Sequence, residues 1–253
     1  MHRVKVNISI LFFLIASTLY GVSTFKNVKI LELTEDIKFT SQEIAKEYFY
    51  TNNTKFKRDK TSLNKIVLDM DDKLRILSRL TKSTNTRNML EFLILNNEEI
   101  SNIISKPYSL KNASLIIEYS EIILESARFL NKENSYNFSS EENMLIGVRN
   151  MAYLLERINK YYVAYHLGFD SNYNTKELNK AIDDFDKELN KLDNYNYESH
   201  ENSDYKSIVS LWKSVRLFFY REKSRNLSNI VYLSTNKLEN LIDKLAIYHS
   251  KNQ

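Results

Sequence analysis

A tandem internal repeat is the feature that most constrains how this chain can fold. The segment at 63–71 is echoed at 178–186, and both copies begin with Leu-Asn-Lys and end in Asp. A second pair of blocks follows in the same order, 114 residues apart, so that Asn112, Ser120 and Leu124 correspond to Asn226, Ser234 and Leu238. A repeat of this length predicts a whole domain copied in tandem rather than a short solenoid unit.

Helix-forming patterns run through both copies. Only 3 of the 253 residues are glycine and 1 is proline, which argues against hairpins and tight-turn-rich folds. Apolar residues instead recur at heptad spacing in the second copy, at Val148, Met151, Leu155, Ile158, Tyr162 and Tyr165. Helices are predicted there at 140–167, 175–192, 205–221 and 226–249, with a loop at 194–204. Gly168 is the expected glycine cap of the first of these helices, and Asn226 the expected N-cap of the last.

The first copy follows the same scheme. Ile37, Ser41, Ile44 and Tyr48 trace its first helix, and further helices are predicted at 60–82, 87–105 and 111–131. The predicted fold class is all-α, with two tandem up-down four-helix bundles at 33–135 and 138–251. A long helix through 139–146 is one way to join them.

The N-terminus has the pattern of an export signal. His2, Arg3 and Lys5 precede an apolar run at 8–19, and small residues follow at Gly21 and Ser23. The run is shorter than the roughly 20 residues of a membrane span. We expect a cleaved signal peptide at 1–23 and a periplasmic or secreted protein, with an uncleaved membrane anchor as the alternative.

The chain lacks the motifs that most enzymes and metal sites need. It has no cysteine, and its four histidines, His2, His166, His200 and His249, do not have metal-ligand spacing. Neither a phosphate-binding glycine loop nor a nucleophile elbow is present. The net charge of +4 comes from interleaved charges rather than the basic stripe of a nucleic-acid binder. We therefore expect a non-enzymatic protein with no metal, cofactor or nucleic-acid partner.

The first helix of each copy resembles a known sensor family. Ser41-Gln42, Ile44-Ala45-Lys46 and Tyr48, and in the second copy Arg157-Ile158, Lys160 and Tyr162, match its signature helix. The segment His166-Leu167-Gly168-Phe169-Asp170 is similar to the Leu-Gly-Val-Asp ending of that helix. The chain thereby resembles the N-terminal sensor domain of type IV pili methyl-accepting chemotaxis transducers. That family is related to the periplasmic nitrate/nitrite sensor modules of histidine kinases.

The resemblance implies a ligand site on these helices. In the nitrate-sensing relatives an arginine of the signature helix grips the anion, and Lys38 and Ala152 stand at its position here. A later signature arginine is Glu43 in the first copy and is kept as Arg157 in the second. The implied ligand-binding side chains are Lys38, Ser41, Gln42, Lys46, Arg149, Arg157 and Lys160. The implied partners are a small anion such as nitrate or nitrite, a membrane chemoreceptor or histidine kinase, and a second copy in a homodimer.

A plainer interpretation competes with this one. The same lysines and arginines can lie on solvated helix faces, and the chain can be a structural or protein-interaction bundle with a decayed ligand site. Such a bundle would dock a partner through exposed aromatics such as Tyr161, Tyr165 or Tyr220. Cations converging between the two first helices favour ligand binding, whereas an apolar core there and an outer aromatic patch favour a partner.

Overall fold

The fold is built of helices over all the residues that can be placed. The computed structural model describes residues 3–52, 59–169, 172–220 and 227–252, and for 3–26, 199 and 220 it describes the backbone alone. Within these ranges there is no strand, which confirms the predicted all-α class. The helices of these ranges are α1 (Arg3–Asn52), α2 (Lys60–Leu80), α3 (Thr84–Ile104), α4 (Leu110–Glu133), α5 (Ser140–His166), α6 (Asn172–Leu192), α7 (Ser199–Tyr220) and α8 (Ser228–Lys251).

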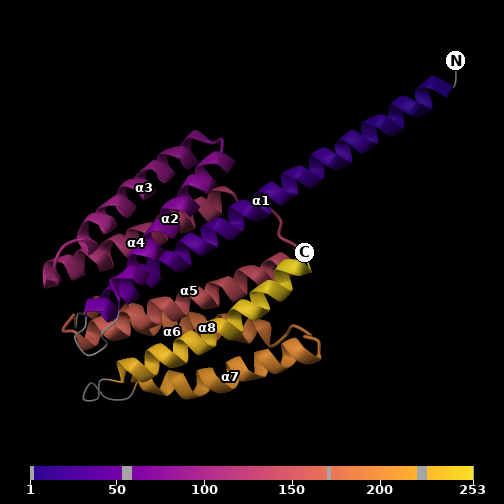
Figure 1. The fold of residues 1–253 in the computed structure, drawn as a ribbon. Helices are drawn as coiled ribbons and strands as arrows, with labels where there is room; N and C mark the ends of the chain where they lie inside the picture. The colour runs from indigo at the N-terminus through magenta and orange to yellow at the C-terminus, as the bar shows by residue number, and fades with distance from the viewer. Residues whose placement is uncertain (1–2, 53–58, 170–171, 221–226, 253) are drawn as a thin grey trace.

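Helix contacts fall into two groups that follow the repeat. In the first group α1 packs on α2 and α4, and α3 closes the ring between them; in the second, α5 packs on α6 and α8, and α8 on α7 (Figure 1). The two groups meet mainly where α1 lies against α5. The first helix of each repeat is therefore central, because it contacts its own group and the other repeat together.

The peripheral helices bury one stripe each, as the sequence periodicity predicts. In α6 the predicted face is buried, as shown by Leu178, Ile182, Phe185 and Leu189. In α7, Trp212 packs against Phe185 with 4.1 Å between ring centroids, and its Nε1 donates to Asp186 at 2.7 Å. The pairing of Trp212 with Asp186 satisfies the indole N–H at the edge of the core.

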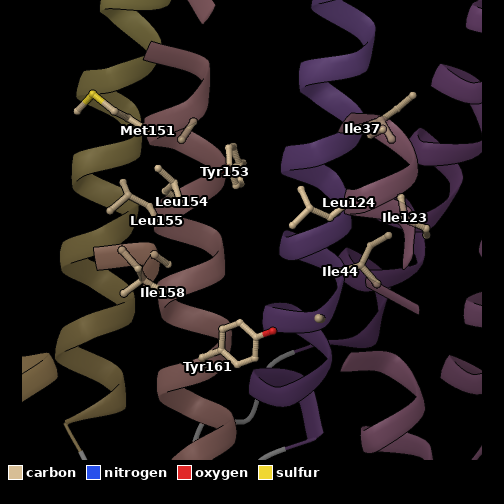
Figure 2. Close-up of a cluster of buried hydrophobic side chains, with 14 of the residues drawn as sticks. Ile37, Ile44, Ile123, Leu124, Met151, Tyr153, Leu154, Leu155, Ile158 and Tyr161 are labelled. Carbon is tan, nitrogen blue, oxygen red and sulfur yellow. The ribbon is translucent and has the colours of Figure 1, made fainter. Parts of the chain in front are cut away.

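The central helices differ, because they are buried on nearly every face. Every residue of α5 from Met151 to Ala164 is buried. Leu155 and Ile158 point from α5 towards α8, whereas Tyr153 and Tyr161 point to the side of α1 (Figure 2). A helix buried all round is normally hydrophobic all round, so the charged residues of this stretch need partners inside the protein.

Some helix boundaries differ from those that the sequence predicts. Ser139 caps α5 in a capping box with Glu142, so the chain enters α5 from a non-helical segment and the expected joining helix through 139–146 is wrong. α7 begins at Ser199 rather than 205, so part of the polar run expected as a loop is helical. Asn226 lies outside the described residues, and α8 begins after Leu227 without a side-chain cap bond.

The N-terminal part of the chain joins the first helix of the first repeat. α1 runs without a break from Arg3 to Asn52, and its N-terminal portion projects beyond the other helices (Figure 1). Among the described residues, no helix has the length and apolarity needed to cross a membrane. The export signal at 1–23 stays a prediction.

Replacement by alanine is expected to have opposite effects on stability at two glycines, one in the cap of α5 and one inside the helix. Gly168 has φ +94°, and the Phe169 N–H bonds back to the Ala164 carbonyl at 3.0 Å, as in a Schellman cap. Gly168→Ala is expected to destabilise the fold by about 1 kcal/mol, because an L side chain disfavours this φ although a Cβ would meet no atom within 4 Å. Urea denaturation measures the change.

Gly147, inside α5, is the matched control. A Cβ there would lie 3.4 Å from Glu188 Oε2, the flexible end of a side chain. Gly147→Ala is expected to stabilise the protein by about 0.5–1 kcal/mol, because alanine has the higher helix propensity. Two shifts of the same sign would contradict this account of Gly168.

Candidate functional site

The contact between α1 and α5 brings the predicted site residues of both repeats together. Lys38 reaches Asn150, and further along both helices Lys46 reaches Glu156, so residue numbers rise together and the two helices run parallel. Equivalent helices of the two repeats are thus packed side by side in the same direction. Charged residues of both repeats therefore lie along the contact between the two first helices.

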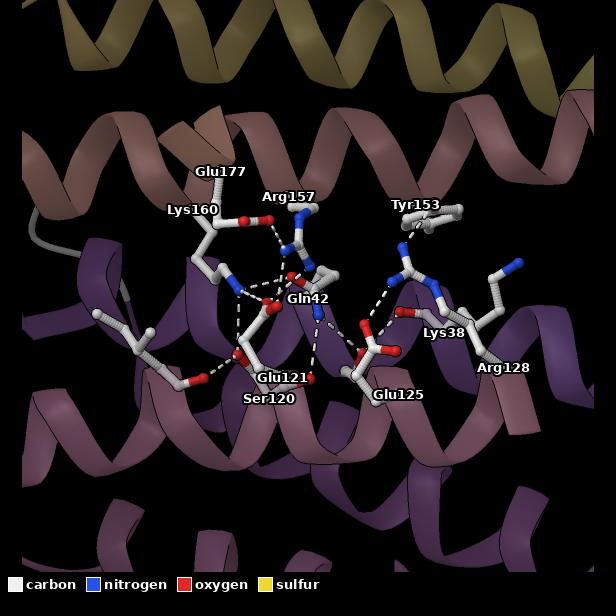
Figure 3. A network of polar contacts seen from close by, with 12 residues as sticks. Lys38, Gln42, Ser120, Glu121, Glu125, Arg128, Tyr153, Arg157, Lys160 and Glu177 are labelled. Carbon is white, nitrogen blue, oxygen red and sulfur yellow. Dashed lines mark hydrogen bonds and ion pairs between the residues drawn. The ribbon is translucent and has the colours of Figure 1, made fainter. Parts of the chain in front are cut away.

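Arg157 and Lys160 form one cluster with carboxylates of α4 and α6. The Arg157 guanidinium donates from Nη1 to Glu121 Oε1 at 2.8 Å, and its Nη2 lies 2.7 Å from both Glu121 Oε2 and Glu177 Oε2. Lys160 Nζ donates to Glu121 Oε1 at 2.5 Å (Figure 3). A planar guanidinium and a carboxylate match in this two-pronged way. Glu121 therefore fills the position that an anion would take between the two cations.

The same cluster extends to α1 through Gln42. Lys160 Nζ donates to Gln42 Oε1 at 2.6 Å, and Gln42 Nε2 donates to Ser41 Oγ and to the Ser120 carbonyl, each at 3.1 Å (Figure 3). Ser41 in turn donates to the Lys38 carbonyl at 2.7 Å. Four of the predicted residues, Ser41, Gln42, Arg157 and Lys160, thus share one buried network that links both repeats.

Lys46 occupies a second cluster, on the α8 side of the contact. Its Nζ lies 2.8 Å from Glu156 Oε2 and 3.3 Å from Glu47 Oε1. Tyr232 of α8 donates its hydroxyl to Glu47 Oε1 at 2.8 Å. Glu43 and Glu239 also act on this group electrostatically, so four carboxyl groups surround one lysine.

Lys38 and Arg149 are held separately. Lys38 Nζ donates to Glu35 Oε2 at 2.6 Å and to Asn150 Oδ1 at 2.8 Å, and it lies 4.7 Å from the centroid of the Tyr153 ring. Arg149 is half-buried and pairs with Asp36 at 3.2 Å. Each of these cations has a carboxylate partner, and neither joins the Arg157 cluster.

The two clusters are related by the repeat. Lys160 lies 114 residues after Lys46, and Glu156 lies 114 residues after Gln42. Lys46 contacts Glu156 while Lys160 contacts Gln42, so each lysine meets the equivalent position of the other repeat. Reciprocal contacts of this kind characterise a two-fold symmetric dimer. The tandem repeat therefore packs as a dimer-like pair within one chain.

Burial and neighbouring charges shift the pKa values of these groups in different directions. Burial alone would raise the pKa of Glu121, but Lys160 and Arg157 outweigh it and lower that pKa to about 2. Burial lowers the pKa of Lys160 to about 8, against the opposing pull of Glu121. Glu121 and Lys160 are consequently both charged at neutral pH.

The Lys46 cluster behaves in the opposite way. Burial, reinforced by the charge of Glu156, raises the pKa of Glu43 to about 7 and that of Glu239 to about 9. Burial also raises the pKa of Glu156, although Lys46 acts against it. One lysine cannot neutralise so many buried carboxylates, so the Lys46 cluster retains protons at neutral pH.

A cavity adjoins the Arg157 cluster on its outer side. It has a volume of about 590 Å³ and lies between α4 and the junction of α5 with α6. Glu121 belongs both to its wall and to the buried network. Its remaining lining residues are Ser114, Ile117, Glu118, Ile122, Gly168, Phe169, Tyr173 and Asn174. The volume is in the range of small-molecule sites.

Several sequence-based expectations need correction. Lys38, Lys46, Arg157 and Lys160 do not lie on solvated helix faces, because each is at most 5% exposed. Of the aromatics proposed for docking, Tyr161 is fully buried and Tyr165 is half-buried. The side chain of Tyr220 lies outside the described residues.

The sequence did not identify the carboxylates that complete the clusters, Glu121, Glu156, Glu177 and Glu239. A usable signal existed nonetheless, because a lysine or arginine inside a helix buried on every face requires an acidic partner. Identifying that partner needs the packing of α4, α6 and α8 around α5, which the helical periodicity of each segment does not contain.

A third polar group, also missed from the sequence, joins the ends of the second repeat. The fully buried His249 of α8 lies with Nδ1 2.7 Å from Glu141 Oε2 and Nε2 3.0 Å from the Tyr197 hydroxyl. It ties the C-terminal end of α8 to the start of α5. Across the described part of the chain, no group of three or more His, Cys, Asp or Glu residues is placed to hold a metal ion.

Comparison with known proteins adds no assignment. No protein-family model matches the chain, and no curated protein or solved structure is significantly similar to it.

Proposed function

We propose that this protein is a non-enzymatic, sensor-type helical bundle in which a ligand bound beside α4 changes how the two repeats pack. The observation that carries the proposal is the shared position of Glu121. Its carboxylate lines the cavity and also holds Arg157 and Lys160, and Lys160 holds Gln42 of α1. A ligand that binds the Glu121 carboxylate therefore acts on the α1–α5 contact through two further side chains, Lys160 and Gln42.

Energetics supports a functional role for the Arg157 cluster. Burying ions costs several kcal/mol each, and a well-packed hydrophobic replacement is often as stable or more stable. Perturbed ionisable groups beside a cavity are a recurrent mark of functional sites. The proposed mechanism needs such a cluster, because ion pairs can be exchanged for a ligand whereas an apolar core cannot.

The proposal includes export and a membrane partner, both drawn from the sequence resemblance. A chemoreceptor or histidine kinase would read the packing of α1 against α5. A small anion such as nitrate or nitrite is a poorly matched ligand for the closed cluster, since it would have to displace Glu121 from both cations.

A structural or partner-binding bundle is the second candidate function. It is favoured by the fact that all seven predicted ligand residues already have partners within the protein. In that case the clusters only hold the repeats in register, and a partner would contact outer helices. The packed pair α2 and α3 exposes Leu68, Phe92 and Leu95.

A thermal-stability screen of the full chain against small amines, carboxylates, nitrate and nitrite separates the two candidates. A true ligand at 100 times its dissociation constant is expected to stabilise the protein by about 2.7 kcal/mol. Amide hydrogen exchange around Gln42 of α1 is expected to change on binding, because Gln42 is the residue of α1 that Glu121 reaches through Lys160. Binding without any change in α1 would refute the sensor mechanism.

A pair of variants tests whether Glu121 transmits the effect of the ligand to α1. In Glu121→Gln the effect of ligand on α1 is expected to disappear, because the carboxylate that holds Arg157 and Lys160 is gone. Glu133→Gln removes one exposed carboxylate from the same helix and is expected to retain the full effect. No stabilisation by any compound in the screen would favour the structural bundle.

A further inference from the structure

The residues that line the cavity between α4 and the α5–α6 junction indicate which class of ligand it can bind. The charged residues of its lining are Glu118 and Glu121, one helical turn apart on α4, and neither lysine nor arginine is among the lining residues. Glu121 stays anionic because Arg157 and Lys160 bind it from behind, with its side chain 14% exposed. Glu118 is exposed and has no hydrogen bond or ion pair with any described residue. Its carboxylate is available to a ligand.

Aromatic side chains form the opposite wall. Phe169 follows the left-handed Gly168 at the end of α5 and packs on Phe49 of α1 at 5.6 Å between centroids. Tyr173, at the start of α6, is 55% exposed although it is large and apolar over most of its surface. Ile117 and Ile122 complete the apolar part of the lining. The cavity is thus lined by aromatic side chains from the α5–α6 junction and by an exposed carboxylate from α4.

We propose that this cavity binds a small organic cation, an ammonium or guanidinium group carried on a short apolar body. The cation would pair with Glu118 and lie against the aromatic faces, which attract positive charge through the ring quadrupole. An anion would be repelled by both carboxylates, and a neutral apolar molecule would leave Glu118 without a partner. This inference rests on the proposed function, because it names the ligand class of the same site.

Three probes of matched shape test the charge preference. Isothermal titration of the full chain with 2-phenylethylammonium, 2-phenylethanol and phenylacetate compares a cation, a neutral molecule and an anion. The ammonium is expected to bind about tenfold more tightly than the alcohol, as a charge-assisted hydrogen bond provides. Phenylacetate is expected to show no binding. Equal affinities for the three probes would overturn the proposal.

Variants assign the site to its residues. Glu118→Gln is expected to weaken ammonium binding about tenfold, and Tyr173→Ala about fivefold, through loss of the ring face. Glu133→Gln, on the same helix but outside the cavity, is expected to change it less than twofold. Both cavity positions are exposed, and circular dichroism checks that the variants fold. Unchanged affinity in Glu118→Gln would overturn the assignment.

The two proposals fail in different ways. If the ammonium binds with the expected preference but hydrogen exchange in α1 does not change, the sensor mechanism fails and the cation site stands. If a different ligand from the screen changes α1 while the three probes show no charge preference, the cation site fails and the sensor mechanism stands.

Discussion

Replacing Glu121 by glutamine is expected to lower the free energy of unfolding by about 3–5 kcal/mol at pH 7, several times the effect expected at Gly168. Glutamine removes the carboxylate that Arg157 and Lys160 share. Arg157 keeps Glu177, but the fully buried Lys160 is left without a carboxylate partner. Equilibrium urea denaturation measures the loss.

Two comparisons isolate the cause. Glu133→Gln is expected to change stability by less than about 0.5 kcal/mol, because its carboxylate is exposed. Adding Lys160→Met to Glu121→Gln removes the unpaired charge and is expected to recover about 0.5–3 kcal/mol, the usual range of coupling between contacting residues. A loss of less than about 1 kcal/mol in the single variant would contradict the role given to Glu121.

Stability is expected to be highest near pH 5 and to decrease as the pH rises to 8. The pKa values of Glu43 and Glu239 are raised in the folded protein to about 7 and about 9, from 4.5 in the unfolded chain. Above pH 4.5 the folded state therefore holds protons that the unfolded state has released. Each such proton lowers the free energy of unfolding by up to about 1.4 kcal/mol per pH unit. Urea midpoints across this range measure the slope.

Below pH 4.5 and above pH 8, other groups determine how stability depends on pH. Below pH 4.5 the lowered pKa of Glu121 reverses the slope, because the unfolded chain then takes up the proton first and stability is lost as the pH falls towards 2. Above pH 8 the lowered pKa of Lys160 opposes further loss, since the folded state releases that proton before the unfolded chain does.

Glu239→Gln tests the source of the slope. Glutamine keeps the shape of a protonated carboxyl group without titrating, so the decrease in stability from pH 5 to pH 8 is expected to become shallower. The variant is also expected to be more stable than the parent at pH 8, because Glu239 must take up a proton when the chain folds at that pH whereas glutamine needs none. An unchanged slope would place the proton uptake elsewhere.

Local patterns in the sequence were sufficient for the framework of this fold. The heptad spacing of Leu178, Ile182 and Phe185 predicts their burial, because one stripe of a peripheral helix faces a core. Gly168 marks the end of α5 for a reason that belongs to its own backbone. Such features depend on the nearest few residues, and the sequence contains them in full.

The interior charges could not be predicted in this way. The same heptad in α5 leaves Arg157 and Lys160 off the seam, where a solvated face is the usual outcome. They are buried because α1 and α4 cover that side, and their partner Glu121 lies 36 residues from Arg157 and 39 from Lys160 along the chain. The resemblance of the signature helices draws attention to these two residues in the sequence, but which groups compensate their charges depends on tertiary packing.

Joining the two repeats in one chain has a consequence for ligand stoichiometry. In a dimer of identical subunits any pocket beside α4 would occur twice, and each substitution would alter both copies. Here the position of Gln42 differs in charge between the repeats, since Glu156 replaces it in the second, whereas Lys160 retains the lysine of Lys46. The contact of α4 with the second repeat therefore adjoins the cavity, whereas the equivalent contact of α8 with the first repeat contains the carboxyl groups that retain protons. A titration of the cavity is expected to saturate at one ligand per chain, without cooperativity.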